Sequence, residues 1–138
     1  MKFYLSSFMF GSETEKLKTL LPPAGKIGHI NNANDVTEIT TKKIPELQSQ
    51  EIEQLNHLGF NAAPLNLRDY FNEEEKLKER LSNLDGVWVS GGNTFVLRQA
   101  MKLSGFDIVF DELKSRNNFL YAGYSAGICV LCDSLKYI

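Results

Sequence analysis

Short apolar segments alternate with longer amphipathic segments along the whole of this chain. The apolar runs are typical of buried strands, and the segments between them carry apolar residues at helical spacing. A helix that links two strands of one sheet makes them parallel through a right-handed crossover. The pattern therefore predicts an α/β fold, a doubly wound, flavodoxin-like parallel sheet with helices on both faces. The predicted strands are 3–5, 26–30, 62–67, 86–89 and 119–122, and the predicted helices are 13–21, 45–58, 72–84, 94–103, 107–116 and 126–135.

Length and charge limit the classes of protein that this chain can belong to. Its 138 residues, 43% of them hydrophobic, suffice for one domain with an apolar core, and no linker or repeat divides residues 1–138. A net charge of −2 provides no basic surface for nucleic acid, and no apolar run is long enough to span a bilayer. The apolar start lacks the features of a signal peptide and is predicted to be a strand. We therefore expect a cytoplasmic protein with no nucleic-acid or membrane partner.

A glycine-flanked serine follows the last predicted strand. Residues 123–127 read GYSAG, a G-x-S-x-G motif between a strand and a helix, which is the sequence of a nucleophile elbow. Such a tight turn exposes the serine hydroxyl above the sheet, and glycine is needed on both sides because larger side chains would collide with neighbouring strands. The backbone N–H of Ala126, at the start of the next helix, is then free to stabilise a developing oxyanion. A chance turn that happens to hold Ser125 is the alternative interpretation.

A second glycine-rich turn lies at the end of the preceding strand. Residues 89–94 read VSGGNT, and adjacent glycines such as Gly91 and Gly92 let a backbone approach a bound group and direct N–H groups at it. A phosphate loop is disfavoured because the motif has neither the lysine of a P-loop nor the spacing of a dinucleotide loop. Both motifs should lie at the carboxyl edge of the sheet, where such folds bind ligands. Trp88 and Phe95, which flank the turn, are predicted core residues.

The two motifs together resemble the dipeptidase E (aspartyl dipeptidase) family of serine peptidases. The similarity is carried by residues 89–95 (VSGGNTF) and 121–127 (YAGYSAG). The resemblance implies the fold of class I glutamine amidotransferases, with serine in place of their cysteine, which disfavours an amidotransferase. Members cleave short peptides, typically dipeptides with an N-terminal aspartate, so a small peptide substrate is expected.

Residue roles follow from the resemblance only where positions match. Ser125 matches the nucleophile, and Ala126 matches one backbone donor to the oxyanion. One of Gly91 or Gly92 matches the other donor. Asn93 belongs to the glycine-loop signature at the substrate side and has no assigned chemical role.

The catalytic base is expected to be absent. The family takes its histidine, and the acid that orients it, from segments after the elbow helix, whereas this sequence ends at residue 138 and is expected to lack the C-terminal part of the fold. Its two histidines, His29 and His57, precede Ser125. We predict that His57 lies on the surface at a helix end and that His29 is a structural residue at a strand end. Without a base a serine is a poor nucleophile, so little or no turnover is expected.

The remaining candidates favour structural roles. Cys129 and Cys132 form a C-x-x-C pair inside the predicted last helix, where we expect buried core thiols rather than an exposed redox pair at a helix start. A zinc site would need two further ligands, so neither a metal nor a cofactor is expected. Residues 31–34 (NNAN) form either a loop facing the site or an ordinary turn.

A non-catalytic function is the alternative to a peptidase. A flavodoxin-like remnant could bind only a ligand or a partner. Apolar surface exposed by missing strands would also favour self-association.

Overall fold

The computed structural model describes residues 1–35 and 43–136 as one α/β unit with five strands and six α-helices in that part of the chain. The strands are β1 (Lys2–Ser6), β2 (Lys26–Ile30), β3 (Asn61–Pro64), β4 (Gly86–Val89) and β5 (Leu120–Tyr124). The α-helices are α1 (Thr14–Thr19), α2 (Lys43–His57), α3 (Glu74–Ser82), α4 (Thr94–Ser104), α5 (Phe106–Leu113) and α6 (Ala126–Cys129), with 3-10 turns η1 (Asn32–Asn34) and η2 (Leu67–Tyr70).

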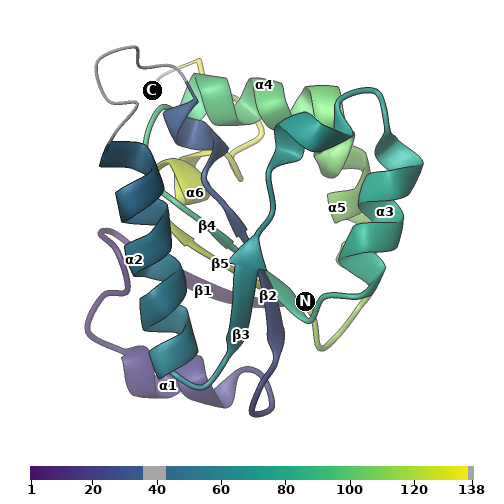
Figure 1. Ribbon diagram of the computed structural model, residues 1–138. Coiled ribbons are helices and arrows are strands. Elements are labelled where there is room, and N and C mark those ends of the chain that lie inside the picture. Colours follow the sequence, from purple (N-terminus) through teal and green to yellow (C-terminus); the bar gives the residue numbers. More distant parts are fainter. Residues whose placement is uncertain (36–42, 137–138) are drawn as a thin grey trace.

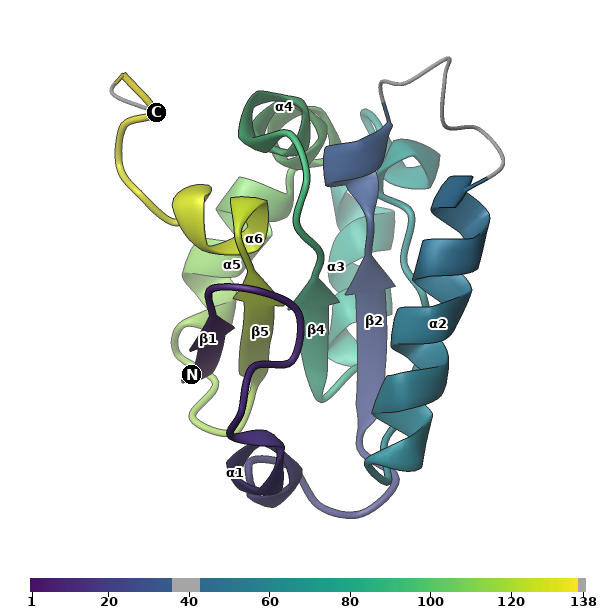
Figure 2. The same cartoon turned by 90° about the vertical axis from the view of Figure 1, so that its left-hand side faces the viewer.

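All five strands are parallel, in the order β1-β5-β4-β2-β3, which confirms the predicted fold class. From β2 the chain moves outward to β3, then returns to β4 and continues to β5 on the other side. The winding direction therefore reverses between β2 and β4. The carboxyl ends at such a reversal are where doubly wound sheets place their ligands. In Figure 2 these ends point upward, beneath η1, α4 and α6.

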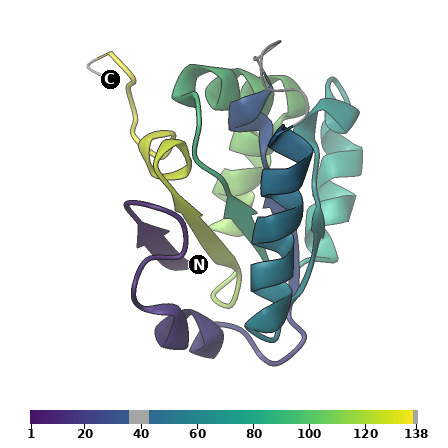
Figure 3. The same ribbon diagram turned by 60° about the vertical axis from the view of Figure 1, so that its left-hand side comes forward.

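Helices cover both faces of the sheet (Figure 1). Successive side chains of a strand point to opposite faces, so Trp88 packs in one apolar cluster while Val87 and Val89 pack in the other. Leu17 of α1 and Leu55 of α2 complete the cluster that contains Trp88. Helices α3, α4 and α5 complete the other cluster. Strand β1 forms one edge of the sheet, beside the start of the chain (Figure 3).

Among the predicted elements whose limits differ from the observed ones, three have a clear local reason. The strand predicted over 62–67 stops at Pro64, because Asn66 accepts a hydrogen bond from the Arg68 amide and starts η2. The helix predicted from residue 72 begins at Glu74, since Asn72 has a left-handed φ of 59°. The helix predicted over 126–135 ends at Cys129. Residues 137–138 lie outside the described residues.

Candidate functional site

Ser125 occupies a strained, exposed turn between β5 and α6. Its φ of 50° and ψ of −113° lie in a region that non-glycine residues rarely adopt, as expected of a nucleophile elbow. The carbonyl of Ser125 accepts hydrogen bonds from the Ile128 and Cys129 amides at 2.9 and 3.0 Å, which closes the turn. The Tyr121 hydroxyl of β5 donates to the Gly127 carbonyl at 2.7 Å, which connects α6 to the preceding strand. The side chain of Ser125 is thereby held at the carboxyl edge of the sheet, open to solvent.

Both glycines of the motif are required by the backbone of β4. A Cβ atom at Gly123 would lie 2.5 Å from the Val89 carbonyl oxygen, and a Cβ atom at Gly127 would lie 2.4 Å from the same oxygen. Neither approach is possible for a real side chain, because the obstacle is backbone inside a sheet. The G-x-S-x-G spacing is therefore explained by close packing of the elbow on the neighbouring strand.

Replacing Gly127 with alanine should destabilise the protein through this collision. We expect Gly127→Ala to lower the free energy of unfolding by about 1–3 kcal/mol, the usual cost of overpacking a close contact. Gly59→Ala is the matched control, since a Cβ atom there meets nothing within 4 Å but the backbone has a φ of 99°. Strain alone should cost about 1 kcal/mol. Urea denaturation measures both, and a smaller loss for Gly127→Ala than for Gly59→Ala would contradict this explanation.

The glycine loop lies directly beside the elbow. A Cβ atom built on Gly91 would lie 3.0 Å from the Cβ atom of Ser125 and 2.7 Å from the ring of Tyr124. Gly92 has a φ of 144° and faces the opposite wall of the loop, where its added Cβ atom would lie 2.8 Å from the Ala33 carbonyl oxygen. The structure therefore brings together the two motifs that the sequence places more than thirty residues apart.

Asn93 performs a structural task in this loop. Its side-chain oxygen accepts hydrogen bonds from the Phe95 and Val96 amides at 3.0 and 3.2 Å, so it caps the start of α4. The prediction of a core position is confirmed for Trp88, which is fully buried. It is wrong for Phe95, whose side chain on the first turn of α4 is 56% exposed.

The asparagine-rich segment after β2 is hydrogen-bonded to the glycine loop. The Asn34 side chain donates to the Gly91 carbonyl at 3.0 Å and to Asn31 Oδ1 at 2.7 Å. The Asn93 amide donates to the Ala33 carbonyl at 2.9 Å. The segment thus forms a 3-10 turn that is hydrogen-bonded to the glycine loop.

A buried carboxylate lies beneath both motifs, and the sequence analysis did not single it out. Glu51 of α2 is 1% exposed, and its Oε1 accepts a hydrogen bond from the Tyr124 hydroxyl at 2.5 Å. Its Oε2 accepts from Ser90 Oγ at 2.6 Å, from His29 Nε2 at 2.6 Å and from Trp88 Nε1 at 3.2 Å. No regular motif marks a lone glutamate in an amphipathic helix. The only available signal was its place on the apolar face, one turn from Leu55.

These hydrogen bonds keep Glu51 ionised. Burial raises the pKa of the carboxyl group, but the hydrogen bonds from His29, Ser90 and Tyr124 outweigh burial and lower the pKa below its ordinary value. Burial, together with the hydrogen bond to Glu51, raises the pKa of the Tyr124 hydroxyl, which therefore keeps its proton and donates it. Every buried side-chain nitrogen or oxygen atom in the described part of the chain has a hydrogen-bond partner.

The two histidines lie where neither contacts Ser125. His29 is completely buried, with Nε2 on Glu51 and with Nδ1 facing the Gln48 amide nitrogen at 3.4 Å, which agrees with the predicted structural role. His57 is the exposed last residue of α2, as predicted. Helix α2 ends at His57, and Figure 2 shows that this end of α2 lies at the amino ends of the strands, opposite α6.

The cysteine prediction is wrong in part. Cys129 is half-buried and Cys132 is exposed, because the helix ends at Cys129 instead of continuing to residue 135. The Arg98 guanidinium donates to the carbonyls of Val130 and Cys132 at 2.7 and 2.6 Å, which stabilises the non-helical path. Both cysteines are free thiols.

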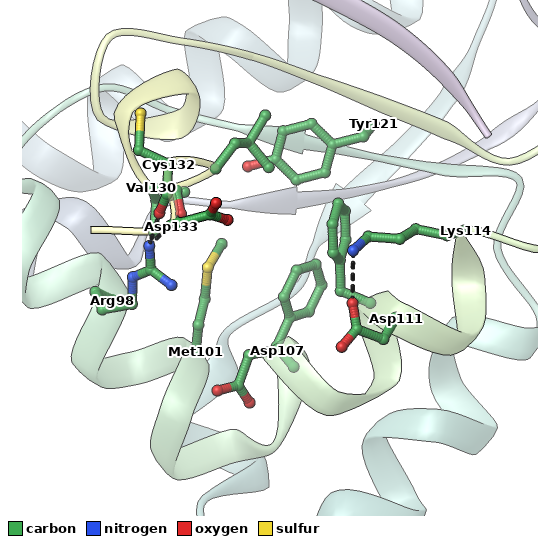
Figure 4. Close-up of a pocket in the computed structure, with 12 residues that line it drawn as sticks. Arg98, Met101, Asp107, Asp111, Lys114, Tyr121, Val130, Cys132 and Asp133 are labelled. Atoms are coloured by element: carbon green, nitrogen blue, oxygen red, sulfur yellow. Dashed lines mark hydrogen bonds and ion pairs between the residues drawn. The ribbon is translucent and has the colours of Figure 1, made fainter. Parts of the chain in front are cut away.

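A cavity lies beside α6, and its lining includes neither Ser125 nor the glycine loop. It has a volume of about 270 Å³ and lies between α4, α5, β5 and the segment after α6. Figure 4 shows Arg98 directed toward the end of α6 and Lys114 paired with Asp111 on the opposite wall, at 2.6 Å. The cavity is lined by Arg98, Met101, Phe106, Asp107, Phe110, Asp111, Lys114, Tyr121, Val130, Leu131, Cys132 and Asp133.

Within residues 1–35 and 43–136, no three His, Cys, Asp or Glu side chains gather as ligands for a metal ion. In the same ranges, no helix combines the length and apolar character needed to cross a membrane.

The fold and this geometry define a doubly wound α/β protein with an exposed serine, in a strand-to-helix turn, beside a glycine-rich loop. Two solved structures share the fold. A crystal structure of a candidate peptidase E from Listeria monocytogenes EGD-e aligns with a TM-score of 0.69 and 26% identity, covering 92% of this chain and 60% of that one. A peptidase from an acI-B1 actinobacterium aligns with a TM-score of 0.71 and 18% identity, covering 94% of this chain and 55% of that one.

Sequence comparison identifies the family. The model of peptidase family S51 matches residues 37–138, most of the chain, and the chain belongs to that family. A curated relative, the uncharacterized peptidase Lmo0363 of Listeria monocytogenes, is 34% identical over 64 residues, which is 46% of this chain and 30% of that protein. The chain thus spans less than two thirds of the length of each of these relatives.

Proposed function

We propose that this chain carries the nucleophile and oxyanion-binding half of a serine-type peptidase. Membership of a peptidase family supports the reaction class. One observation carries the assignment of the site: Ser125 is exposed in a left-handed turn, against the backbone of Gly91. This arrangement fits an activated-serine site, in which the nucleophile and the backbone donors meet at one point above the sheet.

The proposed reaction is acyl transfer. Ser125 Oγ attacks the carbonyl carbon of a peptide bond and gives up its proton, and the carbonyl oxygen becomes a tetrahedral oxyanion. The backbone N–H of Ala126 and an N–H of the Gly91–Gly92 pair would hold that oxyanion. Collapse of the intermediate breaks the C–N bond, the amine leaves with a proton, and water then hydrolyses the serine ester. The first step requires a base to accept the serine proton.

Neither histidine of this chain is proposed as that base. Both nitrogens of His29 face other groups inside the protein, and His57 is at the other edge of the sheet. Removing the base from a serine triad leaves only the acceleration that comes from the oxyanion donors and from binding. We therefore propose that this chain alone has very weak activity, and that the substrates of the whole protein are short peptides with an N-terminal aspartate, as the resemblance to dipeptidase E implies.

A fluorophosphonate probe tests this proposal. We expect slow phosphonylation at Ser125, with a rate that shows no inflection between pH 5 and 8, where an imidazole base would titrate. Ser125→Ala should abolish the adduct, and Ser115→Ala, which removes an exposed hydroxyl in the turn after α5, should not change it. Hydrolysis of Asp-X dipeptides should stay near the level of the Ser125→Ala protein. Rapid labelling that is lost in His29→Ala would contradict the absence of a base.

A specific surface favours self-association as a second property. Strand β1 is an edge strand, and its alternate residues Phe3 and Leu5 are 50% and 45% exposed on the same face. An exposed apolar edge strand is a site at which a second copy can pair. We propose that two copies associate along β1.

Light scattering tests the association. Leu5→Lys should shift the protein toward monomer, because it places a charge in the contact. Ile108→Lys, which charges another exposed apolar residue, 54% exposed on α5, should have no such effect. A parent protein that is monomeric at high concentration would contradict this proposal.

A further inference from the structure

Glu51 connects the elbow and the glycine loop through the two oxygens of one carboxylate. Tyr124, which immediately precedes Ser125, donates to Oε1 at 2.5 Å. Ser90, which immediately precedes Gly91, donates to Oε2 at 2.6 Å. Each half of the proposed site is therefore one residue away from a charge-assisted hydrogen bond to the same group.

The position of the Tyr124 ring also sets the space beside Gly91. A Cβ atom on Gly91 would lie 2.7 Å from Cε2 of that ring, so ring and loop are in close contact. Trp88 and His29 complete the set of donors and leave the carboxylate no freedom to turn. In a buried, fully satisfied network of this kind, a movement of one donor changes the geometry of the others.

Stability alone is a poor reason for such a group. A buried charge costs desolvation, and well-packed apolar residues in its place are often equally or more stabilising. What apolar side chains cannot supply is a fixed direction for each donor. The hydrogen bonds to Glu51 are directional, and they act on the two segments that must face each other across the site.

We propose that Glu51 is a positioning residue that sets the elbow at Ser125 and the loop at Gly91 in register with each other. The proposal rests on the proposed function only in naming these two segments as a catalytic site. It predicts that the carboxylate controls local order at both segments, beyond its effect on global stability. Glu51 itself contacts no substrate.

Amide hydrogen exchange measures this local order without requiring catalysis. Two amides of the elbow turn, Ile128 and Cys129, donate to the Ser125 carbonyl, and the Asn93 amide of the loop donates to the Ala33 carbonyl. The Leu120 amide donates to the Asp85 carbonyl at the amino end of the sheet and reports global unfolding. In Glu51→Gln, the protection factors of the elbow and loop amides should fall by about tenfold more than that of the Leu120 amide. This is the factor expected for the loss of one hydrogen bond to a charged group.

Two milder variants each remove one hydrogen bond to Glu51, from Tyr124 or from Ser90. Tyr124→Phe keeps the ring and should lower protection most at Ile128 and Cys129, with a smaller decrease at Asn93 that is transmitted through Glu51. Ser90→Ala should do the reverse. These variants retain the ionised Glu51 and test the proposal even if Glu51→Gln fails to fold.

A core variant provides the control. Leu81→Ala on α3, in the opposite apolar cluster, should lower the protection of stably bonded amides together. If Glu51→Gln, Tyr124→Phe and Ser90→Ala behave in the same uniform way, Glu51 has only a structural role and the proposal is overturned. Failure of Ser125 to react with a fluorophosphonate would contradict the proposed function but would leave the exchange result unaffected.

Discussion

Replacing Glu51 with glutamine should lower the free energy of unfolding by about 3–5 kcal/mol, the cost of breaking a buried ion pair or charge network on one side. A carboxylate accepts at both oxygens, and here it serves four donors, from His29, Trp88, Ser90 and Tyr124. Glutamine keeps one acceptor oxygen and presents an NH₂ group where the other oxygen was. At least one donor then loses its partner inside the protein, where water cannot replace it.

Urea denaturation checks this result, and α2 supplies its own control. Glu53 lies two residues further along the same helix and is exposed. Glu53→Gln makes the same chemical change in solvent and should alter stability by no more than about 0.5 kcal/mol. Equal effects at the two positions would mean that the network around Glu51 is not formed as described.

Acid should destabilise the parent protein more steeply than the Glu51→Gln protein. The pKa of Glu51 is lowered in the folded state by the hydrogen bonds from His29, Ser90 and Tyr124, which outweigh the effect of burial. A depressed folded pKa means that the unfolded chain binds the proton more readily. The stabilisation is therefore complete above the ordinary value of 4.5 and is lost as the pH falls through the lowered pKa. The extra slope from this one group is at most about 1.4 kcal/mol per pH unit.

Denaturation midpoints between pH 3 and pH 7 test this dependence. The stability difference between the parent and Glu51→Gln should be constant above about pH 5 and should shrink below it. Glu53→Gln should follow the parent at every pH. A difference that grows in acid would show that the folded state raises the pKa of Glu51 and would reverse the sign of its contribution.

The fold was predictable because its signals are local. Alternating apolar and amphipathic segments identify every strand, and β2 and β4 have the predicted limits. The predicted ends of helices were wrong where a single residue determines where the helix begins or ends. Asn72 has a left-handed φ and therefore cannot belong to α3. Arg98, which is distant in the sequence, donates hydrogen bonds to the Val130 and Cys132 carbonyls, so these carbonyls do not need the partners that a longer α6 would have provided.

The site was predictable only in part, for a related reason. Motifs at strand ends identify the elbow and the glycine loop, since topology brings carboxyl ends to one edge. The network beneath them joins residues 29, 51, 88, 90 and 124, which come from β2, α2, β4, β5 and the loop after β4 and follow no spacing rule. For Asn93 the motif indicated a place near the substrate, but the structure explains the residue by its role as the N-cap of α4.

The crystal structure of the phosphonylated protein is the most direct test of the central claim that Ser125 faces the backbone donors of the glycine loop. We expect the phosphonyl group on Ser125, with its oxygen about 2.7–3.1 Å from the amide nitrogen of Ala126 and from that of Gly91 or Gly92. An adduct on another residue, or a phosphonyl oxygen on Ser125 that points to solvent away from both amides, would contradict the account.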